Sequence, residues 1–268
     1  MSTSWLMRYV RRWSAESADG ITGVTLDMRT RAALERVAAG HALSTAQTDA
    51  LARYIGLLLG WRRSNVTGLT DPVAVVETLI GDSLALLAVP QLRERSRGVL
   101  VDLGAGAGIP GIPLAVALPE VGMTLVESVA RKCVFLEAAV AAAGLTGRTS
   151  VACSRSERYA AEGAPGREAH DVVLARAVAR LAVLVELAAP LLATGGVLLA
   201  SKTRAALDVE SAAAAAAAAR CGLSPESPVP LPASPLDDAV CVVFRKTGAT
   251  PPWIPRREGV AGKRPLGR

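Results

Sequence analysis

Short hydrophobic runs alternate with helix-like stretches in the second half of the chain. Five runs rich in β-branched residues recur at a regular spacing, at Gly98–Leu103, Met123–Ser128, Arg148–Ser154, Asp171–Arg176 and Val197–Lys202. Strands that alternate with helices in this way predict βαβ units and a parallel sheet with helices on both faces. A sixth run, at 239–246, follows a proline-rich stretch that suits a loop beside a sheet edge.

The first third of the chain has a helical period instead. The stretch from Ser44 to Trp61 opens with a cap residue and continues with helical spacing of its apolar positions. The stretch 71–90 has Asp71 as its candidate N-cap and Pro72 at the first helical position. We expect both helices to pack on one end of the sheet. The alanine run within 211–220 predicts a crossover helix, because alanine has the highest helix propensity.

Near the start of the chain, Trp5, Tyr9 and Trp13 follow one another at helical spacing, with arginines beside them. This pattern predicts a basic amphipathic helix that docks on the body of the protein. Contact with RNA or with a membrane surface is the alternative.

The composition is that of a globular protein with a core of Ala, Val and Leu, since 51% of the 268 residues are hydrophobic and only 3% are aromatic. The four cysteines, without CxxC spacing and with only two histidines in the chain, predict reduced core thiols in a cytoplasmic protein and no metal site; they are Cys133, Cys153, Cys221 and Cys241. No signal peptide is visible, and charged residues interrupt the longest apolar stretch, which predicts no membrane span.

The net charge of +6 lies entirely in the last 24 residues, where seven basic residues accompany Glu258. A basic tail of this kind indicates a polyanionic partner. The alternative is a solvated chain end with no partner.

The segment 102–111, "DLGAGAGIPG", follows the first predicted strand and indicates a ligand that approaches the backbone closely. It lacks the Gly-Lys-Ser/Thr of a phosphate loop. Residues 106–111 match the dinucleotide pattern GxGxxG, but here Asp102 closes the strand and the first glycine is Gly104. An acid at the strand tip repels a pyrophosphate and suits a ligand with an ammonium or sulfonium group, such as S-adenosylmethionine.

The second strand ends at Glu127, where open α/β folds place a carboxylate against ribose hydroxyls. This acid suits NAD and S-adenosylmethionine equally. The spacing of Asp102, Gly104, Gly106 and Gly108 discriminates between them, and it favours a methyltransferase.

Several longer motifs resemble one family, the ribosomal RNA small subunit methyltransferase G family, also called glucose-inhibited division protein B. They are "DLGAGAGIPGIPLA" (102–115), "TLVESVARKCVFL" (124–136), "SRSERY" (154–159), "ARAVA" (175–179), "GGVLLASK" (195–202) and "PRREGVAGKRPL" (255–266), with "GDSL" (81–84) nearer the start. The resemblance spans roughly residues 45 to 266 and is more specific than a generic glycine loop.

The resemblance implies an α/β fold of class I S-adenosylmethionine-dependent methyltransferases, Rossmann-like with a mostly parallel sheet and with N-terminal helices. It also implies methylation of N7 of a guanine in the 530 loop of 16S ribosomal RNA, in the cytoplasm. By motif, the expected cofactor residues are Gly104, Gly106, Ile109, Glu127, Ser156, Glu157 and Arg176. The ordinary alternatives are a core role for Ile109, a helix-start acid at Glu157 and a strand-end ion pair for Arg176.

Guanine N7 carries a free lone pair, so the sequence need supply no catalytic acid or base, and we expect none. Basic side chains that could hold RNA phosphates are Lys202, Arg256, Arg257, Lys263 and Arg264. We expect 16S RNA or the small ribosomal subunit as partner and a monomeric enzyme.

The patterns divide the chain into an N-terminal extension (1–27), a helical segment (28–95), the methyltransferase domain (96–246) and the basic tail (247–268). Three positions depart from the family pattern, at Arg62, Leu79 and 237–241, all outside the cofactor motifs. Three alternatives therefore stay open: a methyltransferase for another RNA or a small molecule, a non-catalytic RNA-binding relative, and an NAD-dependent oxidoreductase.

Overall fold

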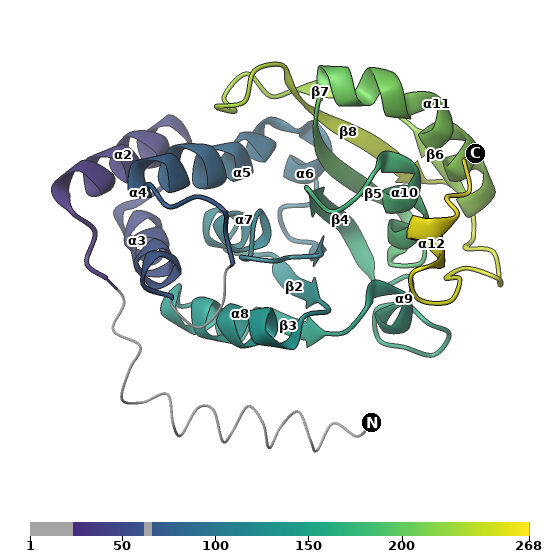
Figure 1. Ribbon diagram of the computed structural model, residues 1–268, viewed down its shortest axis with the longest axis horizontal. Coiled ribbons are helices and arrows are strands. Elements are labelled where there is room, and N and C mark those ends of the chain that lie inside the picture. The colour runs from purple at the N-terminus through teal and green to yellow at the C-terminus, as the bar shows by residue number, and fades with distance from the viewer. Residues whose placement is uncertain (1–23, 62–65, 268) are drawn as a thin grey trace.

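The computed structural model describes residues 24–61 and 66–267 and shows one sheet between two layers of helices (Figure 1). The strand order is β3-β2-β1-β4-β5-β8-β6, and β7 pairs with β8. The strands are β1 Val99–Leu103, β2 Gly122–Glu127, β3 Thr149–Cys153, β4 His170–Arg176, β5 Leu192–Thr203, β6 Leu223–Pro225, β7 Val229–Pro230 and β8 Ala239–Lys246. Strands β1 to β5 are parallel and β8 is antiparallel to β5, which confirms the mostly parallel sheet.

Neighbouring residues of each central strand point to opposite faces, and both faces are buried. In β1, Leu100 belongs to one core cluster and Val101 to the other. The helices after the strands are α7 Gly111–Ala117, α8 Ala130–Ala142, α9 Ser156–Tyr159, α10 Leu181–Ala188, α11 Arg204–Cys221 and α12 Val260–Lys263. Helices α7 and α8 contribute to the first cluster, whereas α10 and α11 contribute to the second. Helix α11 contains the alanine run, as expected.

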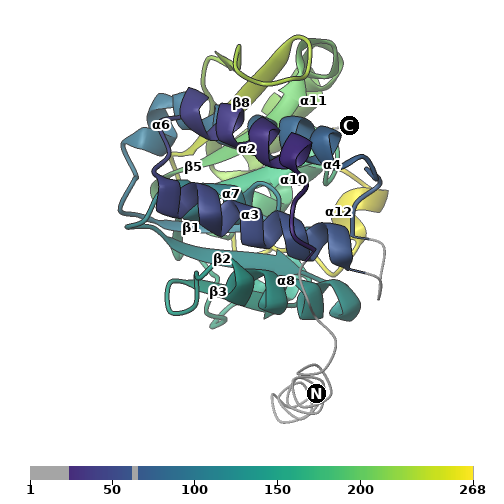
Figure 2. The same cartoon turned by 90° about the vertical axis from the view of Figure 1, so that its left-hand side faces the viewer.

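The N-terminal helices lie across one end of the sheet, where Figure 2 shows α2 and α3 in front. They are α2 Met28–Gly40, α3 Thr45–Gly60, α4 Pro72–Ala74, α5 Gly81–Ala85 and α6 Pro90–Arg93. Ser44 caps α3 with a reciprocal Gln47 contact, and the Asp71 carboxylate caps α4, as the sequence predicts. The helix expected over 71–90 is present and runs without a break from Pro72 to Ala88, with a π-helical turn at Val75–Ile80 between α4 and α5.

Three side chains of α3 tie this layer to the strands and helices of the sheet. The buried Tyr54 hydroxyl donates to the Ala107 carbonyl of the glycine loop at 2.6 Å. Gln47 Nε2 donates to the Val116 carbonyl at 3.0 Å, and Arg53 Nε donates to the Ala142 carbonyl at 2.8 Å. The glycine loop is therefore held from behind by a helix that precedes it by about 50 residues.

The end of the chain folds back onto the body of the protein. Ile254, Ala261 and Leu266 are buried in or against the second core cluster. Arg256 donates from Nε to Glu186 Oε1 at 2.6 Å, and the Glu186 side chain is 2% exposed. The C-terminal segment up to residue 267 is therefore part of the folded body, although the side chains of Arg257, Lys263 and Arg264 on it are exposed.

Two of the four cysteines are not free thiols. Cys133 and Cys153 form a disulfide with their Cα atoms 5.8 Å apart, whereas Cys221 and Cys241 are free and buried. The expectation of four reduced thiols is wrong for the first pair. The packing of α8 against β3 brings Cys133 near Cys153, although 20 residues separate them in sequence.

The aromatic stretch around Trp5, Tyr9 and Trp13 lies outside the described residues, as does Arg62. Leu79 belongs to the first core cluster, and the departure at 237–241 leads into β8. Among the described residues, no helix has the length and apolar character needed to cross a membrane. The same residues hold no cluster of three or more His, Cys, Asp or Glu side chains that could bind a metal ion.

Candidate cofactor site

The carboxyl ends of β1, β2, β3 and β4 meet at one edge of the sheet. The strand order reverses there between β1 and β4, and open α/β sheets bind ligands at such a switch point. Gly104 and Gly106 in the loop after β1 have φ of 72° and 56°. Glycine adopts these left-handed angles without the cost that a Cβ atom would add.

A pocket of about 240 Å³ opens at this edge. Its lining comes from the ends of β1, β2 and β3, from residues after β4, from α10 and from the C-terminal segment: Leu103, Gly104, Val126, Glu127, Ser128, Ser154, Arg155, Ser156, Glu157, Val178, Ala179, Val183, Leu187, Gly259, Ala261 and Gly262. Four of the seven residues expected from the motifs lie together here, namely Gly104, Glu127, Ser156 and Glu157. The pocket therefore combines carboxylates and hydroxyls with an apolar floor.

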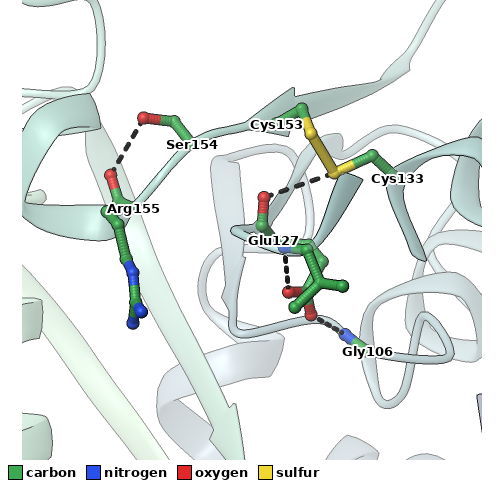
Figure 3. Close-up of a disulfide and its surroundings, with 7 residues drawn as sticks. Gly106, Glu127, Cys133, Cys153, Ser154 and Arg155 are labelled. Atoms are coloured by element: carbon green, nitrogen blue, oxygen red, sulfur yellow. Dashed lines mark hydrogen bonds between the residues drawn. A yellow bond between two sulfur atoms is a disulfide. The ribbon is translucent and has the colours of Figure 1, made fainter. Parts of the chain in front are cut away.

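Glu127 holds the rim of the pocket at the tip of β2. Its Oε2 accepts a hydrogen bond from the Gly106 amide at 3.1 Å, and its Oε1 accepts one from the Val129 amide at 2.8 Å (Figure 3). Gly106 therefore joins the site through Glu127 and does not itself line the pocket. Each carboxylate oxygen has a second lone pair, so Glu127 can also accept hydrogen bonds from a bound ligand.

Asp102 lies beneath the glycine loop and does not line the pocket. It is 1% exposed, and its Oδ2 accepts a hydrogen bond from the Gly111 amide at 2.8 Å. Burial raises the pKa of Asp102 to about 7, and the charge of Glu127 also raises it, whereas the Gly111 amide and Arg176 oppose the rise. Asp102 therefore anchors the loop in this structure, and a direct contact between Asp102 and a charged ligand stays a prediction.

Ser156 and Glu157 begin α9, directly after β3. The Ser156 hydroxyl lies 3.2 Å from Glu157 Oε2 and donates to it. Glu157 Oε1 accepts a hydrogen bond from the Gly259 amide at 2.9 Å. Both oxygens of this carboxylate are thus fixed, one by its neighbour and one by the C-terminal segment.

Arg176 ends β4 but does not line the pocket. Its Nε lies 2.6 Å from Asp82 Oδ2, and the Asp82 side chain is 1% exposed. The Ser234 hydroxyl donates to the other oxygen of Asp82 at 2.6 Å. Arg176 therefore forms the strand-end ion pair that the sequence analysis gave as the alternative to a cofactor contact. Its partner, Asp82 of α5, is buried. Ile109, in turn, is buried in the first core cluster, where the alternative placed it.

The motifs missed several residues that line the pocket. Ser128, Ser154 and Arg155 directly follow β2 and β3, so the rule that ligands bind at strand ends would have found them. Gly259 and Gly262 come from a segment about 100 residues further along the chain, and no local pattern connects them with the site.

Two of the five basic residues proposed to hold RNA phosphates are engaged within the protein. Lys202 Nζ donates to the Ala179 carbonyl and pairs with Glu210, both at 3.0 Å. Arg256 pairs with buried Glu186 and also donates to the Arg264 carbonyl at 2.7 Å. Lys202 and Arg256 would have to give up or share these partners to hold phosphates, so Arg257, Lys263 and Arg264 are the better candidates.

Comparisons with known proteins agree with this arrangement. Residues 47–227 match the family model GidB, described as rRNA small subunit methyltransferase G. Ribosomal RNA small subunit methyltransferase G of Limosilactobacillus fermentum is 39% identical over 232 residues, which cover 85% of this chain and 94% of that one. The protein of the same name from Roseiflexus castenholzii is 40% identical and covers 85% and 95% of the two chains.

One solved structure is similar to this chain in fold but not in sequence. It is described as a putative sarcosine dimethylglycine methyltransferase from Galdieria sulphuraria, at 13% identity and a TM-score of 0.52, covering 75% of this chain and 98% of that one. The fold, the pocket at the switch point and the family match lead to one conclusion: the chain belongs to the rRNA small subunit methyltransferase G family.

Proposed function

We propose that this protein transfers the methyl group of S-adenosylmethionine to N7 of a guanine in the 530 loop of 16S ribosomal RNA, as a monomer in the cytoplasm. The observation that carries the proposal is the family match over residues 47–227, which includes every strand-end motif of the pocket. The alternatives with another RNA, a small molecule or no catalysis are outcomes of the test below.

The pocket suits S-adenosylmethionine on its own geometry. Gly104 lets the loop backbone approach the ligand, the Gly106 amide holds the Glu127 carboxylate, and that carboxylate is placed to accept hydrogen bonds from ribose hydroxyls. Ser156 and Glu157 form the side of the pocket where the adenine would lie. We assign Ile109 and Arg176 to supporting the loop and the rim, since both lie outside the pocket lining. When bound, the cofactor supplies an electrophilic methyl group.

The chain's own residues then have to position the guanine and exclude water. N7 has a lone pair and no proton to lose, so no general base is needed, and orientation supplies most of the acceleration. The position of His170 is consistent with a reaction that uses no general base. His170 begins β4, at the edge of the sheet opposite to the pocket, and is 2% exposed. Burial also lowers the pKa of His170, which favours the neutral ring.

Exposed basic residues beside the pocket are the proposed RNA contacts. Arg257, Lys263 and Arg264 are exposed on the C-terminal segment whose glycines line the pocket. Phosphate contacts from these side chains would give affinity that falls with salt, without choosing a sequence. The guanine itself must be unstacked or lie in an irregular loop for N7 to reach the pocket.

The test is a map of N7-methylguanine in small-subunit RNA from cells with the gene, without it, and with a Glu127→Ala variant. We expect one guanine of the 530 loop to lose its methyl group without the gene and to stay unmethylated with the variant. Loss of methylation at a different site would replace the proposed target. An unchanged map, together with purified protein that binds RNA but not S-adenosylmethionine, would favour a non-catalytic relative.

A further inference from the structure

Residues 254–266, called here the C-terminal strap, close one side of the cofactor pocket. Gly259, Ala261 and Gly262 of the strap line the pocket together with Glu127 and Glu157. Ala261 lines the pocket and, at 3% exposure, is also packed against the interior of the protein. The strap thus contacts the cofactor site directly, in addition to carrying the basic residues.

Partly buried contacts fix both ends of the strap. At its start, Arg167 Nη1 donates to the Ile254 carbonyl at 3.0 Å, and Arg256 pairs with Glu186. At its end, Arg220 Nη1 donates to the Leu266 carbonyl at 3.2 Å. Loss of one partner from a buried ion pair such as Arg256–Glu186 is strongly destabilising, so the strap is held firmly at this anchor.

Between these ends, the strap reaches one of the proposed cofactor residues. The Gly259 amide, at a φ of 76°, donates to Glu157 Oε1 at 2.9 Å. The neighbouring pair Arg158–Glu258, at 2.7 Å, links α9 to the strap a second time, although both side chains are largely exposed and such pairs contribute little. The orientation of the Glu157 carboxylate therefore depends on the position of the strap.

We propose that the C-terminal strap is a positioning element of the cofactor site. The Gly259 amide orients the Glu157 carboxylate, and Gly262, which has no side chain, leaves space in the pocket for the cofactor. This inference rests on the proposed function, because it assumes that the pocket binds S-adenosylmethionine. It gives the strap a role in cofactor affinity that is separate from any contact with RNA.

The test fills the pocket from the strap side. A Cβ atom at Gly262 would meet no atom within 4 Å, and the residue has no positive φ, so we expect Gly262→Phe to fold. Because Gly262 lines the pocket, we expect the added ring to reduce the space for the cofactor. The matched control is Gly122→Phe, which also has open space but lies at the start of β2, at the opposite edge of the sheet. Thermal unfolding without ligand compares the folds of the two variants with that of the wild type.

Calorimetric titration with S-adenosylmethionine gives the result. We expect Gly262→Phe to weaken binding at least about tenfold, a loss of roughly 1.4 kcal/mol, and Gly122→Phe to bind like the wild type. Equal affinity of the two variants overturns the strap proposal while the proposed function stands. A wild-type protein that does not bind the cofactor contradicts the proposed function itself.

Hydrogen exchange provides a second measurement that needs no variant. If the strap is part of the site, S-adenosylmethionine slows amide exchange in a peptide that covers 254–266 of the wild-type protein, and Gly259 is among the protected amides. Exchange that cofactor leaves unchanged in this peptide, at saturating concentration, also overturns the proposal.

Discussion

Among single residues, the sequence identified those at the pocket, such as the Glu127 carboxylate, but not the residues that support the glycine loop from beneath. Gly104 and Glu127 were predictable, since a glycine loop after a strand and an acid at the next strand tip both have a physical reason. The anchoring role of Asp102 and the burial of Ile109 depend on packing against distant parts of the chain. Sequence spacing carries no information about such contacts.

Gly104→Ala is expected to weaken S-adenosylmethionine binding by about tenfold. The φ of 72° makes the substitution strained by roughly 1 kcal/mol, and the new Cβ would approach Val178 Cγ2 to 3.0 Å, which distorts the loop at the pocket. Gly195→Ala is the control, because it has a similar φ of 85° and open space around it, away from the pocket. Calorimetry that finds the same affinity for both variants would contradict the expected role of the loop.

Asp102→Asn is expected to change how stability depends on pH. The folded pKa of about 7 lies above the unfolded value of about 3.9, so this carboxyl lowers the stability of the wild type as pH rises between these values. The variant lacks that loss and should gain at least ~1 kcal/mol relative to the wild type between about pH 5 and about pH 8. Urea unfolding at several pH values measures the difference, and a constant difference would show that Asp102 does not titrate in this window.

At the level of elements, the sequence predicted β1 to β4 and β8 to within one residue, whereas β5 begins five residues earlier than predicted and the short strands β6 and β7 were not predicted. The regular alternation of apolar runs and helical stretches depends only on local spacing, and this is the most reliable signal in a sequence. The π-helical turn at Val75–Ile80 escaped prediction, because the spacing of apolar positions does not distinguish it from the α-helical turns on either side. The Cys133–Cys153 pairing escaped for the same kind of reason, since it requires α8 and β3 to be side by side.

Reduction of the disulfide is expected to lower the melting temperature by roughly 5–10 °C. A cross-link that closes a loop of this size stabilises a protein by about 3 kcal/mol, chiefly by restricting the unfolded chain. Cys133 Sγ also lies 3.4 Å from the Glu127 carbonyl, so the cross-link is next to the pocket (Figure 3). Thermal scans with and without a thiol reductant test this, and a Cys133→Ser/Cys153→Ser variant should show no response to reductant.

In the protein as a whole, the basic tail packs apolar side chains into the core and also presents exposed basic side chains. Composition could locate the charge but could not say which cations face solvent. Arg256 is used within the protein, whereas Arg257 and Arg264 are exposed. Deletion of the tail would therefore remove buried residues such as Leu266 together with the charges, and point substitutions give the cleaner test.

The double variant Arg257→Ala/Arg264→Ala is expected to weaken RNA binding and to flatten its salt dependence by one to two phosphate contacts, or about one to two units of slope. The control is Arg29→Ala/Arg36→Ala, which removes the same charge from α2 at the opposite side of the molecule (Figure 1). Binding of 530-loop RNA measured over a range of salt concentrations checks this. Equal slopes for the two double variants would exclude the tail as the electrostatic contact.

The hydrogen bond from Tyr54 to Ala107 has a practical consequence for any attempt to shorten this enzyme. A fragment that starts just before β1 would keep every residue of the pocket lining but would leave the Ala107 carbonyl without the donor that α3 supplies. It would also uncover the apolar faces of α7 and α8 that the N-terminal helices bury. The minimal catalytic unit of this protein therefore begins upstream of its first strand, with the helix that supports the loop.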